Sequence, residues 1–268
     1  MPSIRRPDGA TIHYEVHGQG DPVLCLGGWG TFCHGNLRGL PFGLGDRYKV
    51  VILDYRGLAD STDNLETPIS MGTYAEDAIA VLDELGFGNV HLLGMVGIGA
   101  CVCQQIAIAR PDLTRSLVNT GAWARMDPLL ADQLRLFADV HRHAGWETFQ
   151  RLVCAYSFEP GYYNGNADRL IGPEGPWREL RGRLETHERF IAASLDYDAI
   201  DALGSVTAPA LVMHAPLDVI TGPRTTMPIE AALPNATGFT MEGAAHVLAG
   251  KEQRSRFSEL LFDFFERV

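Results

Sequence analysis

Five short apolar runs place the strongest constraint on how this 268-residue chain can fold. They read PVLCLGG, KVVILDYRG, VHLLG, SLVNTG and PALVMHA, and each ends in residues typical of turns. Strands that are apolar at every position, rather than at every second one, are typical of a parallel sheet covered on both faces. Amphipathic segments typical of helices, 73–88, 99–112 and 252–268, lie between or after these runs. The alternation predicts an α/β fold with a mostly parallel central sheet and helices on both faces.

The alternation stops in a stretch of the second half, residues 122–205, which is helical in pattern and rich in large aromatic residues. Only the segment 159–176, EPGYYNGNADRLIGPEGP, has the composition of a loop. In open α/β sheets ligands bind at the carboxyl ends of the strands. We therefore expect residues 1–121 and 206–268 to form the core and residues 122–205 to form a helical lid, or cap, over those ends.

Composition excludes several classes of partner. A formal net charge of −11 argues against nucleic acid and against an anionic membrane surface. No apolar run is long enough to span a bilayer, and the first residues lack the apolar stretch of a secretion signal. The five cysteines are odd in number and lack C-x-x-C spacing, so they predict neither a disulfide framework nor a zinc site. We expect a cytoplasmic protein with no bound metal and no cofactor.

The segment HLLGMVGIGACVCQQ, residues 91–105, predicts a strand, a glycine-rich turn and the start of a helix. A dinucleotide-binding turn is one interpretation, but the glycine spacing is G-x-x-G-x-G rather than G-x-G-x-x-G. The next strand, SLVNTG, also ends without the acidic residue that would bind a ribose. The alternative interpretation is a nucleophile elbow, the sharp strand-to-helix turn G-x-S-x-G.

Five segments in order resemble those of the α/β-hydrolase superfamily. LCLGGWG is similar to the oxyanion loop, VVILDYRGLADST to the D-x-R-G-x-G-x-S segment, and the glycine turn to the elbow. LVMHAPLDVITGP is similar to the segment with the catalytic acid, which aligns on Asp218, and GAAHVLAGKEQ to the one with the catalytic histidine, His246. The resemblance implies an α/β-hydrolase fold and a pocket under the cap.

The elbow departs from the family pattern because the nucleophile aligns on Val96, whose side chain cannot attack a carbonyl. Ile98 stands two positions later, where the family has a small residue, so we expect a turn of altered shape or a register shifted by one. The shifted register places Gly97 at the tip, which is no more reactive. Either register excludes an acyl-enzyme formed at this position.

A histidine–carboxylate pair and an oxyanion hole are what remains for chemistry. By resemblance, Asp218 would orient His246, which would act as a general base, and the backbone N–H groups of Trp29 and Gly97 would stabilise an oxyanion. Further pocket candidates are Gly28, His34, Trp123 and Val219. Cys33, Cys101 and Asp60 are weaker candidates for a substitute nucleophile.

These residues predict an enzyme of this superfamily that acts on a small, largely apolar or aromatic molecule without forming a covalent acyl-enzyme. Lyase, cyclase, decarboxylase and direct water-attack chemistry all stay open. An inactive ligand-binding relative and a hydrolase whose serine was replaced at position 96 are the alternatives. The sequence also leaves a homodimer open.

Overall fold

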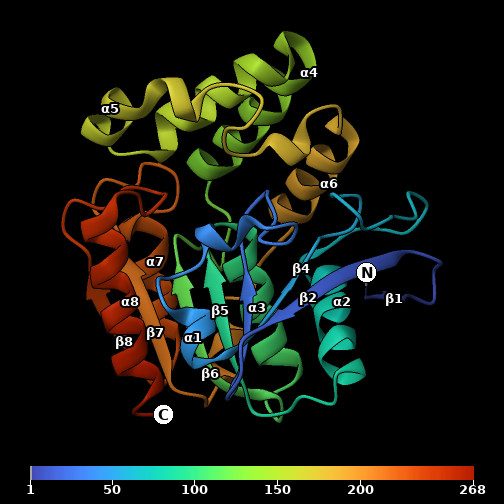
Figure 1. The fold of residues 1–268 in the computed structure, drawn as a ribbon, viewed down its shortest axis with the longest axis vertical. Helices are drawn as coiled ribbons and strands as arrows, with labels where there is room; N and C mark the ends of the chain where they lie inside the picture. The colour runs from blue at the N-terminus through green and yellow to red at the C-terminus, as the bar shows by residue number, and fades with distance from the viewer. Residues whose placement is uncertain (1) are drawn as a thin grey trace.

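The computed structural model describes residues 2–268, which form one eight-stranded sheet with helices on both faces and a further layer of helices above the carboxyl ends of the strands (Figure 1). The strands are β1 Ser3–Arg5, β2 Thr11–His17, β3 Pro22–Leu26, β4 Lys49–Leu53, β5 Val90–Met95, β6 Thr114–Thr120, β7 Ala210–His214 and β8 Ala236–Thr240. The helices are α1 Leu44–Arg47, α2 Met71–Glu84, α3 Ile98–Ala109, α4 Pro128–Ser157, α5 Pro160–Leu170, α6 Leu184–Leu195, α7 Pro223–Ala232 and α8 Lys251–Phe265.

The sheet has the order β1-β2-β4-β3-β5-β6-β7-β8. β2 pairs antiparallel with β1 and β4, and all strands from β4 to β8 in that order run parallel. The five apolar runs form β3 to β7, so the predicted parallel sheet is confirmed. The sequence patterns missed β1 and β8, because three residues are too few for a period and β8, ATGFT, is mostly half-exposed.

Two hydrophobic clusters, one on each face of the sheet, explain why those strands are apolar at every position. Along β3 and β4, Leu24 and Val51 pack in the cluster with α2 and α3, whereas Val23 and Val50 pack in the cluster with α1 and α8. Successive side chains of a strand point to opposite faces, so both sets must be apolar to be buried.

Helices α4, α5 and α6, which we call the cap, lie above the carboxyl ends of the strands (Figure 1). α4 is interrupted at Gly145, whose φ of 81° and ψ of 169° are not helical. The prediction of a loop over 159–176 is wrong for its first part, which is α5. Glu159 caps that helix by accepting hydrogen bonds from the N–H groups of Gly161 and Tyr162, and Pro160 fits its first turn.

A buried histidine pair joins two cap helices. His141 of α4 and His187 of α6 have their Nδ1 atoms 3.1 Å apart, and His187 also packs edge-on against Trp29 below the cap. Burial, with the neighbouring His141, lowers the pKa of His187 to about 3. The cap is therefore packed around an uncharged imidazole that is fully buried.

We expect acid to weaken this packing. The unfolded chain protonates His187 near its ordinary pKa of about 6.5 and the folded chain near 3, so the unfolded state binds more protons in between. The free energy of unfolding should therefore fall as the pH decreases. His187 alone should contribute up to about 1.4 kcal/mol per pH unit to that fall. Urea unfolding between pH 7 and 5 measures the slope. His187→Gln should flatten it, and His143→Ala, at an exposed position of α4, should not; equal slopes in both variants would contradict the assignment.

No helix within residues 2–268 combines the length and apolar character needed to cross a membrane.

Candidate active site

The turn between β5 and α3 has its tip at Gly97 rather than at Val96. Gly97 has φ 61° and ψ −130° and immediately precedes the first helical residue, Ile98. Two residues beyond this tip, a Cβ on Gly99 would come within 2.4 Å of the carbonyl oxygens of Leu26 and Gly27. Only glycine allows α3 to pack this closely on β3, so Gly99 fills the place that the sequence pattern assigned to Ile98. The glycine requirement at position 99 fits the shifted register, and Val96, the tip in the unshifted register, also has a positive φ, 63°.

The shift changes which backbone groups can stabilise an oxyanion. Gly97 was expected to supply one N–H, but that N–H donates to the carbonyl of Gly121 at 2.9 Å and is therefore occupied. The N–H groups of Ile98 and Trp29 donate to no other residue of the described chain, and both residues line the same cavity. Ile98 is the residue after the tip and lies at the positive end of α3. Trp29 and Ile98 are therefore the candidate pair.

Asp218 and His246 lie in the loops that follow β7 and β8 and form a hydrogen-bonded pair. The Nδ1 atom of His246 is 2.9 Å from Oδ2 of Asp218. Thr221, which the sequence did not single out, adds its hydroxyl 2.9 Å from Nδ1 and 3.1 Å from Oδ2. The other oxygen of Asp218 accepts from the N–H groups of Ile220 and Thr221, both at 2.8 Å. Nδ1 is thus held as the protonated nitrogen, and Nε2 is left as the basic one.

The Asp218 carboxylate stays charged although its side chain is fully buried. Burial opposes the charged form, but His246 and the two N–H donors outweigh it, so the pKa of Asp218 lies below its ordinary value. A charged, oriented carboxylate fixes the tautomer of His246 and stabilises the imidazolium that forms when His246 accepts a proton.

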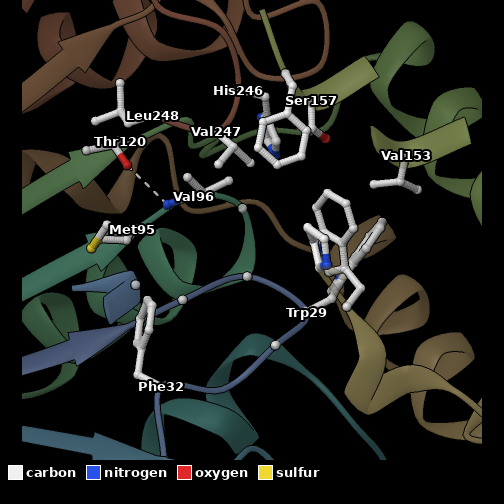
Figure 2. A pocket seen from close by; sticks show the side chains of 18 of the residues that line it. Trp29, Phe32, Met95, Val96, Thr120, Val153, Ser157, His246, Val247 and Leu248 are labelled. Carbon is white, nitrogen blue, oxygen red and sulfur yellow. Dashed lines mark hydrogen bonds between the residues drawn. The ribbon is translucent and has the colours of Figure 1, made fainter. Parts of the chain in front are cut away.

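A cavity of about 450 Å³ lies between the carboxyl ends of the strands and the cap (Figure 2). Its floor includes Gly28 and Trp29 of the loop after β3 and Val96 of the turn after β5. Figure 2 shows His246 beside Val96 and Val247 on one side of it. Apolar side chains form most of the remaining wall: Phe32, Met95, Ile98, Trp123, Leu134, Phe137, Val153, Phe158, Trp177, Ile220, Leu248 and Phe257.

Two polar groups in this wall lack a partner. The hydroxyl of Ser157 and the indole N–H of Trp123 are buried and make no hydrogen bond with any described residue. Both residues line the cavity, Ser157 at the end of α4 and Trp123 just after β6. Buried polar groups are nearly always hydrogen-bonded in proteins, so these two are suited to bind polar atoms of a ligand. Nothing in the sequence distinguished Ser157 from the other cap residues.

His34 and Val219, both predicted as pocket residues, do not line the cavity. His34 turns away from it, with its Nε2 2.7 Å from Oδ2 of Asp54. Val219 is exposed, and its carbonyl accepts a hydrogen bond from Gln133 of the cap. His34 follows the lining residues 27–32, whereas Val219 immediately precedes the lining residues Ile220 and Thr221.

The three substitute nucleophiles also lie outside the cavity lining. Cys33 is buried, and burial together with Asp54 raises the pKa of its thiol well above the ordinary value. Cys101 is buried in α3, where its thiol donates to the carbonyl of Trp123. Asp60 is exposed. None of them replaces the missing serine.

The rim of the cavity carries more positive than negative side chains, in contrast to the net charge of −11. Arg178 pairs with Glu174 and Glu179. Three further arginines complete the charged part of the lining: Arg38, Arg169 and Arg254. An anionic group at one end of an apolar ligand would meet this rim favourably.

The order of these parts along the chain is diagnostic: the turn follows β5, the acid follows β7 and the histidine follows β8. That arrangement characterises enzymes with a strand-to-helix elbow and an acid–histidine pair. The chain belongs to the α/β hydrolase fold family, whose sequence model matches residues 21–252.

Among curated proteins, the chain is similar to two named "Putative carbamate hydrolase RutD". The one from Azorhizobium caulinodans is 26% identical over 255 residues, which cover 95% of both chains. The one from Stutzerimonas stutzeri is 26% identical over 266 residues, which cover 94% of this chain and 96% of the relative.

Solved structures show the same fold. A hydrolase from Pseudomonas aeruginosa PA01 superimposes with a TM-score of 0.83 at 24% identity, over 98% of this chain and 97% of the other. The enol-lactonase from Burkholderia xenovorans LB400 gives a TM-score of 0.82 at 17% identity, over 99% and 100%. At these identities the likeness concerns the fold alone.

Proposed function

We propose that this chain hydrolyses small, largely apolar acyl compounds, carbamates among them, by direct attack of water that His246 activates. The observation that carries the proposal is the geometry at the cavity floor. An oriented His246–Asp218 pair and two free N–H groups face a cavity in which the elbow tip, Gly97, has no side chain. The names of the similar RutD proteins support a carbamate as one substrate class.

In the proposed reaction the substrate carbonyl oxygen binds the N–H groups of Trp29 and Ile98. His246 removes a proton from a water molecule through Nε2, and the resulting hydroxide oxygen bonds to the carbonyl carbon. The carbonyl electron pair moves to oxygen, where the two N–H groups stabilise its charge. The tetrahedral intermediate then collapses, and the leaving group departs with the proton that His246 had accepted.

The enclosing side chains decide which molecules fit. The apolar wall favours an acyl chain or ring, and the hydroxyl of Ser157 and the indole N–H of Trp123 offer two hydrogen bonds to its polar atoms. The arginines of the rim favour a substrate with an anionic end. Measuring kcat/KM for a panel of aryl carbamates and esters, each with and without a carboxylate, would show how strongly each of these features affects substrate preference.

We expect turnover without a covalent intermediate. With a hydrolysed member of that panel, quenched samples should show no added mass on the protein, and the first turnover should show no burst. Ser157→Ala should raise KM several-fold with kcat little changed, because it removes a binding contact. An acylated Ser157, or a burst that this variant abolishes, would contradict direct water attack. Ligand binding with no product from any member would favour a binding protein instead.

A further inference from the structure

A second group of chemistry-bearing side chains lies outside the cavity lining, beside strand β2. His13 and Glu15 stand two positions apart on β2 and therefore share one face of the strand. Cys33 follows the oxyanion loop and comes to the same place. One donor atom from each of the three lies within 4.8 Å of the others. His34, next in the chain, stacks on His13 with ring centroids 4.9 Å apart.

One nitrogen in this group is buried and unpartnered. Nε2 of His13 makes no hydrogen bond within the described residues, although only 2% of this histidine is exposed. It faces Oε1 of Glu15 at 3.6 Å. Buried polar atoms without a partner are rare in proteins, and an unseen ion is one of their ordinary explanations.

We propose that His13, Glu15 and Cys33 bind a divalent transition-metal ion of the zinc type. Nitrogen, thiolate and carboxylate ligands suit Zn²⁺ and Co²⁺ and do not suit Mg²⁺ or Ca²⁺, which take oxygen ligands. Cys33 binds as the thiolate and releases its proton to solvent when the ion enters. The sequence did not indicate this site, because its ligands come from two segments about twenty residues apart without a finger-type spacing.

His34 belongs to a second group, with His13 and Asp60, and not to the group of His13, Glu15 and Cys33. Its Nε2 is 2.7 Å from the buried Asp54 carboxylate, which fixes that nitrogen as the donor and leaves a lone pair on Nδ1. A donor atom of His34 and one of Asp60 lie within 4.8 Å of a ring nitrogen of His13. Glu15 is oriented in turn, since it accepts from the backbone N–H of His34 at 2.8 Å and contacts the ring of His17 at 2.7 Å.

The site adjoins the oxyanion loop. Thr31 donates its hydroxyl to Asp54 at 2.5 Å and accepts the backbone N–H of Cys33 at 3.0 Å. An ion bound by Cys33 would therefore hold the segment that carries Trp29. None of the three proposed ligands lines the cavity, so the ion would stabilise the fold without contacting the substrate.

Cobalt titration of the metal-free protein tests the proposal. We expect one Co²⁺ per chain and a thiolate-to-cobalt charge-transfer band in the near ultraviolet. Cys33→Ser should abolish the band, and His13→Gln should weaken Co²⁺ binding at least about tenfold. His143→Ala, in the exposed part of α4, is the matched histidine control and should bind like the parent.

A second measurement, the unfolding temperature of the unmodified protein, stays informative even where a variant folds poorly. Zn²⁺ should raise the unfolding temperature of the unmodified protein, because it binds the folded state only, and should leave that of Glu15→Gln nearly unchanged. Absence of the band and of the thermal shift in the unmodified protein would overturn the proposal. So would a band that Cys33→Ser retains.

Discussion

Replacing His246 by alanine should lower kcat/KM by about three orders of magnitude, the middle of the range for loss of a general base. In the proposed reaction no other group can accept the proton of the attacking water, since Asp218 is buried behind the histidine and the elbow tip is a glycine. Steady-state hydrolysis of the best substrate in the panel measures the effect. Asp218→Asn should give a loss of similar order, because the amide no longer fixes the tautomer of His246 or stabilises its charged form.

The exposed His143→Ala again serves as the control and should keep full activity. Whether the loss appears in kcat or in KM matters as much as its size. A fall in kcat with little change in KM identifies an interaction made in the transition state, whereas a rise in KM alone would assign His246 to substrate binding. A His246→Ala protein with the parent's kcat/KM would exclude the dyad as the source of catalysis.

The central sheet could be predicted because each of its buried strands has a recognisable local residue pattern. Residues buried on both faces, such as Val50 and Val51, must be apolar one after another, and that pattern is visible in the sequence. α5 could not be predicted in the same way. Its residues have a loop composition, and the helix depends on capping by Glu159 and on packing of the cap.

The dyad and the elbow differ in how much the sequence reveals. Asp218 and His246 align on motif segments, and the structure brings their side chains within hydrogen-bond distance. The register of the turn depends instead on backbone angles and on how closely α3 approaches β3 at Gly99, neither of which the residue pattern contains. The choice between Gly97 and Ile98 as the oxyanion N–H donor depends on this register.

Contacts between distant segments were the least predictable part. Ser157 enters the cavity wall from α4, more than fifty residues after the elbow, and no local pattern marks a residue that will be buried without a partner. The group around His13 is similar, because its members meet only when the loop after β3 folds back against β2.

The shifted register makes a serine at position 97 informative. A Cβ there has room, since its nearest neighbour would be the Cα of Gly28 at 4.0 Å. Gly97 also lies beside the dyad: its N–H donates to Gly121, where a Cβ would be 3.6 Å from Nδ1 of His246. The residue after it, Ile98, has a free N–H to stabilise an oxyanion.

Gly97→Ser should therefore create a covalent nucleophile that the parent lacks. With a fluorophosphonate probe, the serine oxygen should bond to phosphorus and displace fluoride, while His246 accepts the hydroxyl proton. The positive φ of 61° should cost about 1–3 kcal/mol of stability for a residue with a side chain. Intact mass spectrometry should show one adduct per chain, and none in the parent or in Gly97→Ser combined with His246→Ala.

Val96→Ser is the matched variant that separates the two registers. A serine at 96 is followed by Gly97, whose N–H is bound to Gly121 and cannot stabilise the phosphoryl oxygen, so this variant should stay unlabelled. Labelling of Val96→Ser but not of Gly97→Ser would place the tip at Val96 and restore Gly97 as the oxyanion donor. Labelling of Gly97→Ser alone would mean that the elbow keeps its activating geometry although the chain has lost the residue it activates.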